Sequence, residues 1–328
     1  MDETTPAGRK MDAAAALAPS FAYVKERLFS PFSFEIWLTL GFVSFIEQFG
    51  NGGGVNFPLN SIFGPSPAGG DGEGAEAVSQ ALDRAIEFVR ANIPWIAAII
   101  VVVFALAVLL SYLGARGTFM YLDNVARRRA EVAEPWRRSG LHAMSYFLWR
   151  LAIGFASLAA VLLSASPAVV VIYRLLVQKI GPDPFAIGIL FLSSIFVVVV
   201  VLTAWIVSVL LRSFVAPIMY RFGLPAGSAW SVFLRAARGN VLQIVLYFLL
   251  QIAVGMAFGI AAILLMFCTC CFGLLPVIQQ TILQPFLLFA QVYPLYVLES
   301  LAPEFRIIEP APDPWTAPAP PGDQDRRP

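Results

Sequence analysis

The segment between Arg238 and Glu299 runs for 60 residues without a charged side chain. A helix needs about 20 apolar residues to cross a bilayer, so this run is long enough for two crossings and a turn. It therefore predicts an all-α, polytopic membrane protein. The two crossings are expected to be separated near Cys270-Cys271, where Phe272-Gly273 follows.

Four further windows with few charges predict additional crossings. They cover residues 34–49, 91–115, 151–173 and 184–211. The first is the weakest, because Glu35 and Glu47 lie near its two ends. We expect a helical bundle of six transmembrane helices, or of five if the first segment is re-entrant.

Basic residues predict the orientation of these crossings. Lysine and arginine concentrate in residues 9–27, 116–138 and 212–238, whereas the turn between the third and fourth crossings holds only Arg174 and Lys179 as basic residues and the turn between the last two has no charge. The positive-inside rule then places the basic segments and both termini in the cytoplasm. Only 13% of the residues are charged, compared with about 25% in an average soluble domain.

Composition divides the chain into three parts. Residues 1–20 are expected to be a flexible cytoplasmic N-terminus, residues 21–302 the membrane domain, and residues 303–328 a disordered, proline-rich tail. Within the membrane domain, residues 50–91 form an outer loop followed by an amphipathic helix over Ala75–Arg90. This helix is expected to pack on its own bundle, on the membrane surface or on a partner.

An internal duplication is suggested by two matching stretches. YFLWRLAIGFA at Tyr146–Ala156 aligns with YFLLQIAVGMA at Tyr247–Ala257, with six identities in eleven positions. In this alignment Arg150 corresponds to Gln251. A similar interfacial segment precedes the first crossing, so interfacial amphipathic helices belong to the predicted unit. The predicted repeat is parallel, because a two-span unit preserves orientation, and it differs from the inverted repeats of many transporters.

Several polar side chains within the predicted crossings are candidates for a solute pathway: Glu47, Gln251, Gln280, Gln284 and Gln291. Ionisable groups in a bilayer are costly and often functional. The alternative is structural, with Glu47 at a wet end of a short crossing and the glutamines bonding neighbouring helices. The motif Gly255-xxx-Gly259 lets another helix approach closely.

Basic side chains are candidates for contacts with anionic lipid headgroups: Arg127, Arg128, Arg129 and Arg150. The alternatives are that the first three only set the topology and that Arg150 snorkels to the interface. Cys268, Cys270 and Cys271 are interpreted as small filler rather than a metal site or a disulfide. We predict no catalytic residue, metal or cofactor, because there is one histidine and no hydrolase, metalloprotease or phosphate-loop motif.

Proline and aromatic residues at the helix joints, in FSPFSFEIW and FVAPIMY, occur together with the closing stretch VYPLYVLESLAPEF. In these features the chain resembles prokaryotic six-span proteins related to the membrane domain of glycerophosphoryl diester phosphodiesterases, over about Phe21 to Arg306. The resemblance implies a six-span fold and a location in a prokaryotic cytoplasmic (inner) membrane. It carries over no activity, because the soluble phosphodiesterase domain of that family is absent from this sequence.

These observations predict a non-enzymatic integral membrane protein with a structural or lipid-associated role. One alternative is a transporter or channel for a small or lipidic solute. Another is an accessory subunit that docks through Ala75–Arg90. The expected partners are membrane lipids and either another membrane protein or a second copy of the chain, and no nucleic acid.

Overall fold

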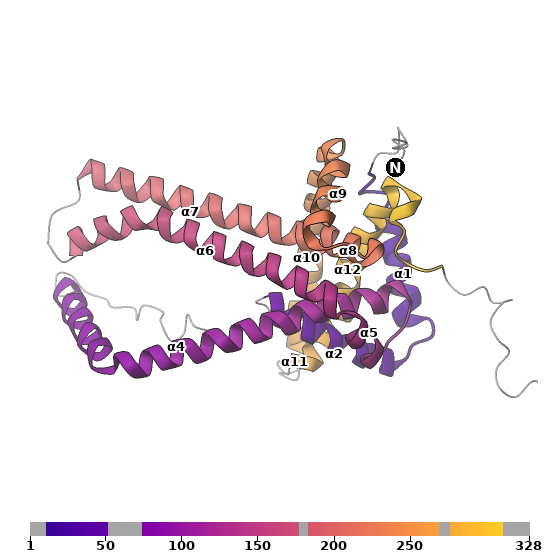
Figure 1. The fold of residues 1–328 in the computed structure, drawn as a ribbon, viewed down its shortest axis with the longest axis horizontal. Helices are drawn as coiled ribbons and strands as arrows, with labels where there is room; N and C mark the ends of the chain where they lie inside the picture. The colour runs from indigo at the N-terminus through magenta and orange to yellow at the C-terminus, as the bar shows by residue number, and fades with distance from the viewer. Residues whose placement is uncertain (1–10, 52–73, 177–182, 269–275, 311–328) are drawn as a thin grey trace, which may run out of the picture.

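The computed structural model describes residues 11–51, 74–176, 183–268 and 276–310. Within these ranges the regular structure is helical, with no strand. Figure 1 shows a compact region that contains α1, α2, α8 and α12, from which α4, α6 and α7 project together. The predicted all-α class is therefore confirmed.

The elements have the following bounds: α1 Leu17–Phe29, α2 Phe34–Asn51, α4 Gly74–Ala126, α5 Ala133–Arg138, α6 Gly140–Leu176, α7 Pro184–Leu210, a π-helical turn Leu211–Val215, α8 Ala216–Phe222, α9 Ala226–Arg238, α10 Val241–Cys268, α11 Pro276–Ile282, α12 Gln284–Leu301 and a 3-10 turn Pro303–Phe305. Local sequence explains several of these ends. Asp183 caps α7 by accepting a hydrogen bond from the Ala186 amide at 2.6 Å, and Pro184 occupies the first turn.

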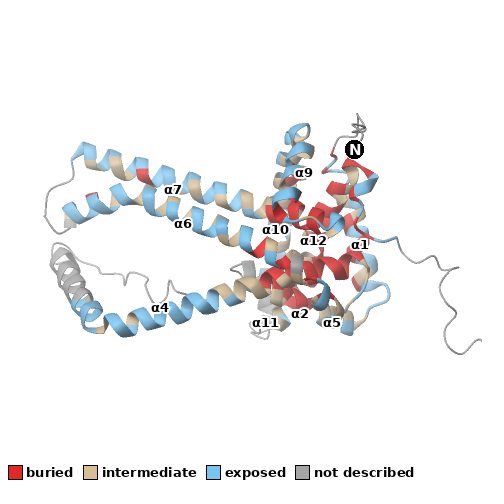
Figure 2. Cartoon of the chain, in the orientation of Figure 1, coloured by how far each residue is buried: buried red, intermediate tan, exposed pale blue. Residues whose placement is uncertain are grey.

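Four described helical segments are long and apolar enough to cross a membrane: Glu87–Ala126, His142–Leu175, Pro184–Phe222 and Val241–Ala261. Their apolar side chains are largely exposed (Figure 2), for example Leu163 at 74% and Leu242 at 78%. Apolar surface of this extent is unfavourable in water and favourable in hydrocarbon. The helices are therefore compatible with a membrane protein.

The first predicted crossing, residues 34–49, lies in α2, which is the second helix of a bent pair. Leu17–Phe29 and Phe34–Gln48 meet at an angle of 120°, and together they give a fifth candidate crossing. The last predicted crossing is divided into α11 and α12, with Leu283 between them. The predicted turn at Cys270-Cys271 lies outside the described residues.

The predicted amphipathic helix is the first part of α4 rather than a separate element. Helix α4 is continuous from Gly74 to Ala126, contains Pro94 and is bent (Figure 1). A proline removes one backbone donor and favours such a bend. Helical structure over Ala75–Arg90 is thus present, and Glu87–Arg90 is exposed rather than packed on the compact region.

Helix α2 packs closely on α4 and α11 because glycines lie at both crossings. A Cβ atom added to Gly117 on α4 would lie 2.5 Å from the Glu47 backbone nitrogen on α2. One added to Gly41 on α2 would lie 3.0 Å from the Thr281 Cα atom on α11. These contacts bring Glu47 into the interior, where it is 2% exposed.

The N-terminal segment connects elements that are distant in the sequence. The Met11 amide donates to Asn240 Oδ1 before α10 at 3.0 Å, and the Asp12 amide donates to Ser300 Oγ near the end of α12 at 2.9 Å. The Tyr23 hydroxyl donates to the Val125 carbonyl at 2.8 Å, near the end of α4. The start of α10 and the ends of α4 and α12 are therefore all tied to the N-terminal region.

Candidate functional site

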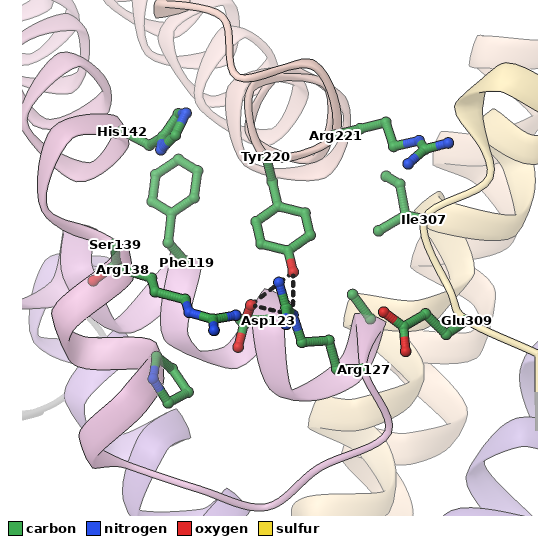
Figure 3. Close-up of a pocket in the computed structure, with 12 residues that line it drawn as sticks. Phe119, Asp123, Arg127, Arg138, Ser139, His142, Tyr220, Arg221, Ile307 and Glu309 are labelled. Carbon is green, nitrogen blue, oxygen red and sulfur yellow. Dashed lines mark hydrogen bonds and ion pairs between the residues drawn. The ribbon is translucent and has the colours of Figure 1, made fainter. Parts of the chain in front are cut away.

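A cavity of about 340 Å³ lies where the end of α4, α5, the start of α6, α8 and the C-terminal segment meet (Figure 3). Its lining is rich in charged and polar side chains. The lining residues are Phe119, Asp123, Ala126, Arg127, Pro135, Arg138, Ser139, His142, Tyr220, Arg221, Ile307 and Glu309. We call this cavity the basic pocket.

The wall formed by α4 and α8 holds a hydrogen-bonded group at its centre (Figure 3). The Tyr220 hydroxyl donates to Asp123 Oδ1 at 2.7 Å and accepts from Arg127 Nε at 3.5 Å. Arg127 Nε also lies 3.1 Å from Asp123 Oδ1. The hydrogen bond that Arg127 donates to the Tyr220 hydroxyl and the nearby Asp123 carboxylate raise the pKa of the Arg127 guanidinium, so it stays charged.

Two further arginines reach the pocket from different elements. Arg138 pairs with Glu134 one turn earlier on α5. Arg221 donates from Nε to the Glu304 carbonyl at 3.2 Å, which leaves its charge without a carboxylate partner among the described residues. Helix α8 ends at Phe222, one residue after Arg221, because Gly223 adopts a φ of +66° that favours glycine at a helix C-terminus.

The remaining wall is formed by His142 and the C-terminal segment. The His142 ring lies over Phe119 with ring centroids 6.0 Å apart. The Glu309 amide donates to the Ala126 carbonyl at 2.8 Å, which fixes the segment beside α4. The lining thus contains three guanidinium groups and two carboxylates, and one of these guanidinium groups, that of Arg138, is paired with Glu134, which is not part of the lining.

The arginines predicted to bind headgroups occupy different surroundings. Arg127 lines the basic pocket. Arg128, whose side chain is half-buried, pairs with Glu26 at 2.7 Å, and Arg129 pairs with Glu134 at 3.1 Å on exposed surface. Arg150 lies in α6, away from this pocket, and its buried Nη1 has no hydrogen-bond partner in the described part of the chain.

Glu47 forms an interior ion pair that was not predicted from the sequence. Arg212 in the π-helical turn contacts Glu47 Oε1 through Nε at 3.0 Å and Nη2 at 2.9 Å. The sequence interpretation placed Arg212 in a basic loop because it follows a long apolar run. The structure corrects this, because the helix continues through Arg212 into α8.

Two of the predicted pathway glutamines form hydrogen bonds between helices. The Gln284 amide donates to the Tyr121 hydroxyl at 2.7 Å and accepts from Ser44 Oγ at 3.3 Å. Gln280 and Gln48 exchange two hydrogen bonds of 2.7 Å. These bonds connect α11 and α12 with α2 and α4. Such bonding between neighbouring helices is the structural alternative to a solute pathway.

Gln251 and Gln291 differ from the other two because they line a common cavity with Arg212. Within the described ranges, no group of three or more histidine, cysteine or acidic side chains could hold a metal ion. Helix α10 ends at Cys268, and Cys270 and Cys271 lie outside the described residues.

The residues that line the basic pocket could not be predicted from a single sequence motif. Arg127 belongs to a visible basic run, but Arg138, Tyr220, Arg221 and Glu309 come from separate segments. The sequence signal was the excess of arginine in residues 116–138 and 212–238. It predicted that these two segments lie on the same side of the membrane, but not that they line one cavity.

Comparison with known proteins assigns the chain to a family whose function is unknown. No curated protein and no solved structure matches the chain. A family model described as a family of unknown function, DUF7544, matches residues 11–284, which include most of the described helices. The chain belongs to this family, DUF7544.

Proposed function

We propose that this chain is a non-enzymatic inner-membrane protein whose basic pocket binds the anionic headgroup of a membrane lipid. In this proposal the chain crosses the bilayer six times. The bent pair of α1 and α2 includes the first crossing, and α11 with α12 makes the last. Both termini and the basic pocket lie on the cytoplasmic side.

Contacts between segments that are far apart in the sequence support this topology. The N-terminal segment contacts the region before α10 and the end of α12, while Glu309 contacts the end of α4. The three basic segments therefore lie near one another, as the positive-inside rule requires of cytoplasmic loops. An even number of crossings returns the chain to that side.

Matching environments support the proposed internal repeat. Tyr146 and Tyr247, which start the two aligned stretches, are both buried. One turn later, Arg150 and Gln251 each have a buried polar atom without a hydrogen-bond partner among the described residues. Equivalent positions thus have similar surroundings in the two stretches.

The observation that carries the lipid proposal is the convergence on one cavity of three arginines, one directly after α4, one on α5 and one on α8. A guanidinium group offers several donors in a planar arrangement that suits phosphate oxygens. The hydrogen bonds that position Arg127 and Arg221 use Nε. Their terminal nitrogens are thus available to a phosphate at the membrane surface.

We expect anionic lipid to stabilise the protein through this pocket. In mild detergent, phosphatidylglycerol should raise the thermal unfolding midpoint more than phosphatidylcholine does. Arg127→Gln together with Arg221→Gln should lower the apparent affinity for phosphatidylglycerol roughly tenfold or more, because charge-assisted hydrogen bonds are lost. The measurement is a lipid titration followed by thermal unfolding.

The control is Arg235→Gln with Arg238→Gln, which removes two charges from exposed positions on α9 outside the pocket. This variant should respond to phosphatidylglycerol as the wild type does. Inorganic phosphate and glycerol phosphate serve as separate ligands. Stronger stabilisation by either of these than by the lipid would instead assign the pocket to a soluble phosphate compound.

A further inference from the structure

A second cavity, of about 290 Å³, lies between the end of α7, α10 and α12. Four polar side chains reach it, those of Arg212, Ser213, Gln251 and Gln291. The rest of its wall is apolar and consists of Trp205, Val209, Phe248, Ile252 and Ala290. The cavity is near the lower end of the usual size of small-molecule sites, about 300 to 1,000 Å³.

Two glutamine amides in this wall have unused hydrogen-bonding capacity. Gln291 is only 4% exposed, and its side chain has no hydrogen-bond partner in the part of the chain that the structure describes. Gln251 Oε1 is buried and likewise has no hydrogen-bond partner among the described residues. A buried polar group without a partner is unfavourable, so both amides are suited to a ligand in the cavity.

The ion pair of Arg212 with Glu47 favours a neutral ligand in this cavity. The Arg212 guanidinium is already paired with Glu47, so the cavity has no unbalanced positive charge from this residue. Arg212 and Ser213 belong to the π-helical turn, and such turns often occur at functional sites. The Ser213 hydroxyl accepts from the Tyr247 hydroxyl at 3.0 Å, which fixes that side of the wall.

An apolar groove of about 260 Å³ adjoins the cavity and shares Gln251 and Ala290 with it. The face of α10 that carries Gly255 and Gly259 forms one side of the groove. A Cβ atom added at Gly255 or Gly259 would meet nothing within 4 Å, so no described helix packs on this face. Phe258 closes the groove against Phe286, with ring centroids 4.2 Å apart.

We propose that the cavity and the groove together bind a neutral amphiphile with a hydroxyl head and one long alkyl chain. A hydroxyl both donates and accepts, so it can donate to the Gln251 carbonyl oxygen and accept from the Gln291 amide. The alkyl chain lies along Gly255 and Gly259. This site is separate from the basic pocket in position, charge and ligand class.

The test uses the full chain in nanodiscs of phosphatidylcholine with a long-chain alcohol that carries a photoreactive diazirine in its chain. We expect adducts concentrated on α10 and the first turns of α12. Unlabelled 1-hexadecanol should compete roughly tenfold better than its methyl ether, which cannot donate a hydrogen bond. Mass spectrometry of the peptides locates and counts the adducts.

Two sets of variants test separately the cavity that binds the hydroxyl head and the groove that binds the alkyl chain. Gln251→Leu should remove the preference for the alcohol over the ether, and Gly255→Leu with Gly259→Leu should reduce labelling of α10. Gly154→Leu on α6, where an added Cβ also meets nothing within 4 Å, is the matched control and should change neither.

Two results with the wild type would overturn the proposal, whatever the variants do. One is labelling spread evenly over the exposed faces of α4, α6, α7 and α10, which would indicate general solvation by the alcohol. The other is equal competition by the alcohol and the ether, which would leave the unpartnered amides without a role in binding.

Discussion

Glu47→Gln is expected to destabilise the protein strongly, by about 3 kcal/mol, because Arg212, which lies within a candidate membrane span with its side chain 35% exposed, loses its counter-charge. Glu47 is almost fully buried, and both contacts from Arg212 reach its Oε1 atom. Arg212→Gln should have a similar effect, since it leaves the carboxylate unpaired. The measurement is the free energy of unfolding in a mixed detergent titration.

The double substitution Glu47→Gln with Arg212→Gln should be much less harmful than the sum of the two single changes, because no buried charge remains. The control is Arg129→Gln, which breaks an exposed pair with Glu134 and should change stability by about 0–1 kcal/mol. Additive effects in the double variant would show that the two side chains do not interact as the structure places them.

Gly117→Ala is the second substitution with a large expected effect. The new methyl group would lie 2.5 Å from the Glu47 nitrogen and 2.7 Å from its Cα atom, both backbone atoms of α2. Helices α2 and α4 would have to separate, which would also shift Glu47 relative to Arg212. Overpacking of this kind costs about 1–3 kcal/mol or more.

Thermal unfolding of purified Gly117→Ala in detergent measures this cost. Gly154→Ala is the matched control, because it adds the same methyl group to α6 where nothing lies within 4 Å. The control should be as stable as the wild type or slightly more stable, since alanine favours helix. Equal stability of the two variants would contradict the close crossing of α2 and α4.

The long apolar helices were predictable because hydrophobicity is a local property of the sequence. The windows at residues 91–115, 151–173 and 184–211 all fall within helices that the structure describes. The division between α11 and α12 was missed, although Pro285 gave a signal because proline favours the first turn of a helix. Gln280 and Gln284 therefore belong to two helices rather than one.

The sites were less predictable because their residues are far apart in the sequence. Glu47 was recognised as unusual from its place in an apolar segment, but its partner is 165 positions away. Gln251 and Gln291 were selected together with Gln280 and Gln284, yet the first two line one cavity and the other two bond to side chains on α2 and α4. A single sequence cannot separate these pairs, since the difference depends on which helices meet.

The pocket that gathers Arg127, Arg138 and Arg221 is the centre of the proposed function, and native mass spectrometry tests it directly. The wild-type protein, released from nanodiscs of mixed phosphatidylglycerol and phosphatidylcholine, should retain phosphatidylglycerol preferentially. The variant with Arg127→Gln and Arg221→Gln should lose that preference, and the variant with Arg235→Gln and Arg238→Gln should keep it. Equal retention of the two lipids by the wild type, or an unchanged preference in the pocket variant, would contradict the proposal.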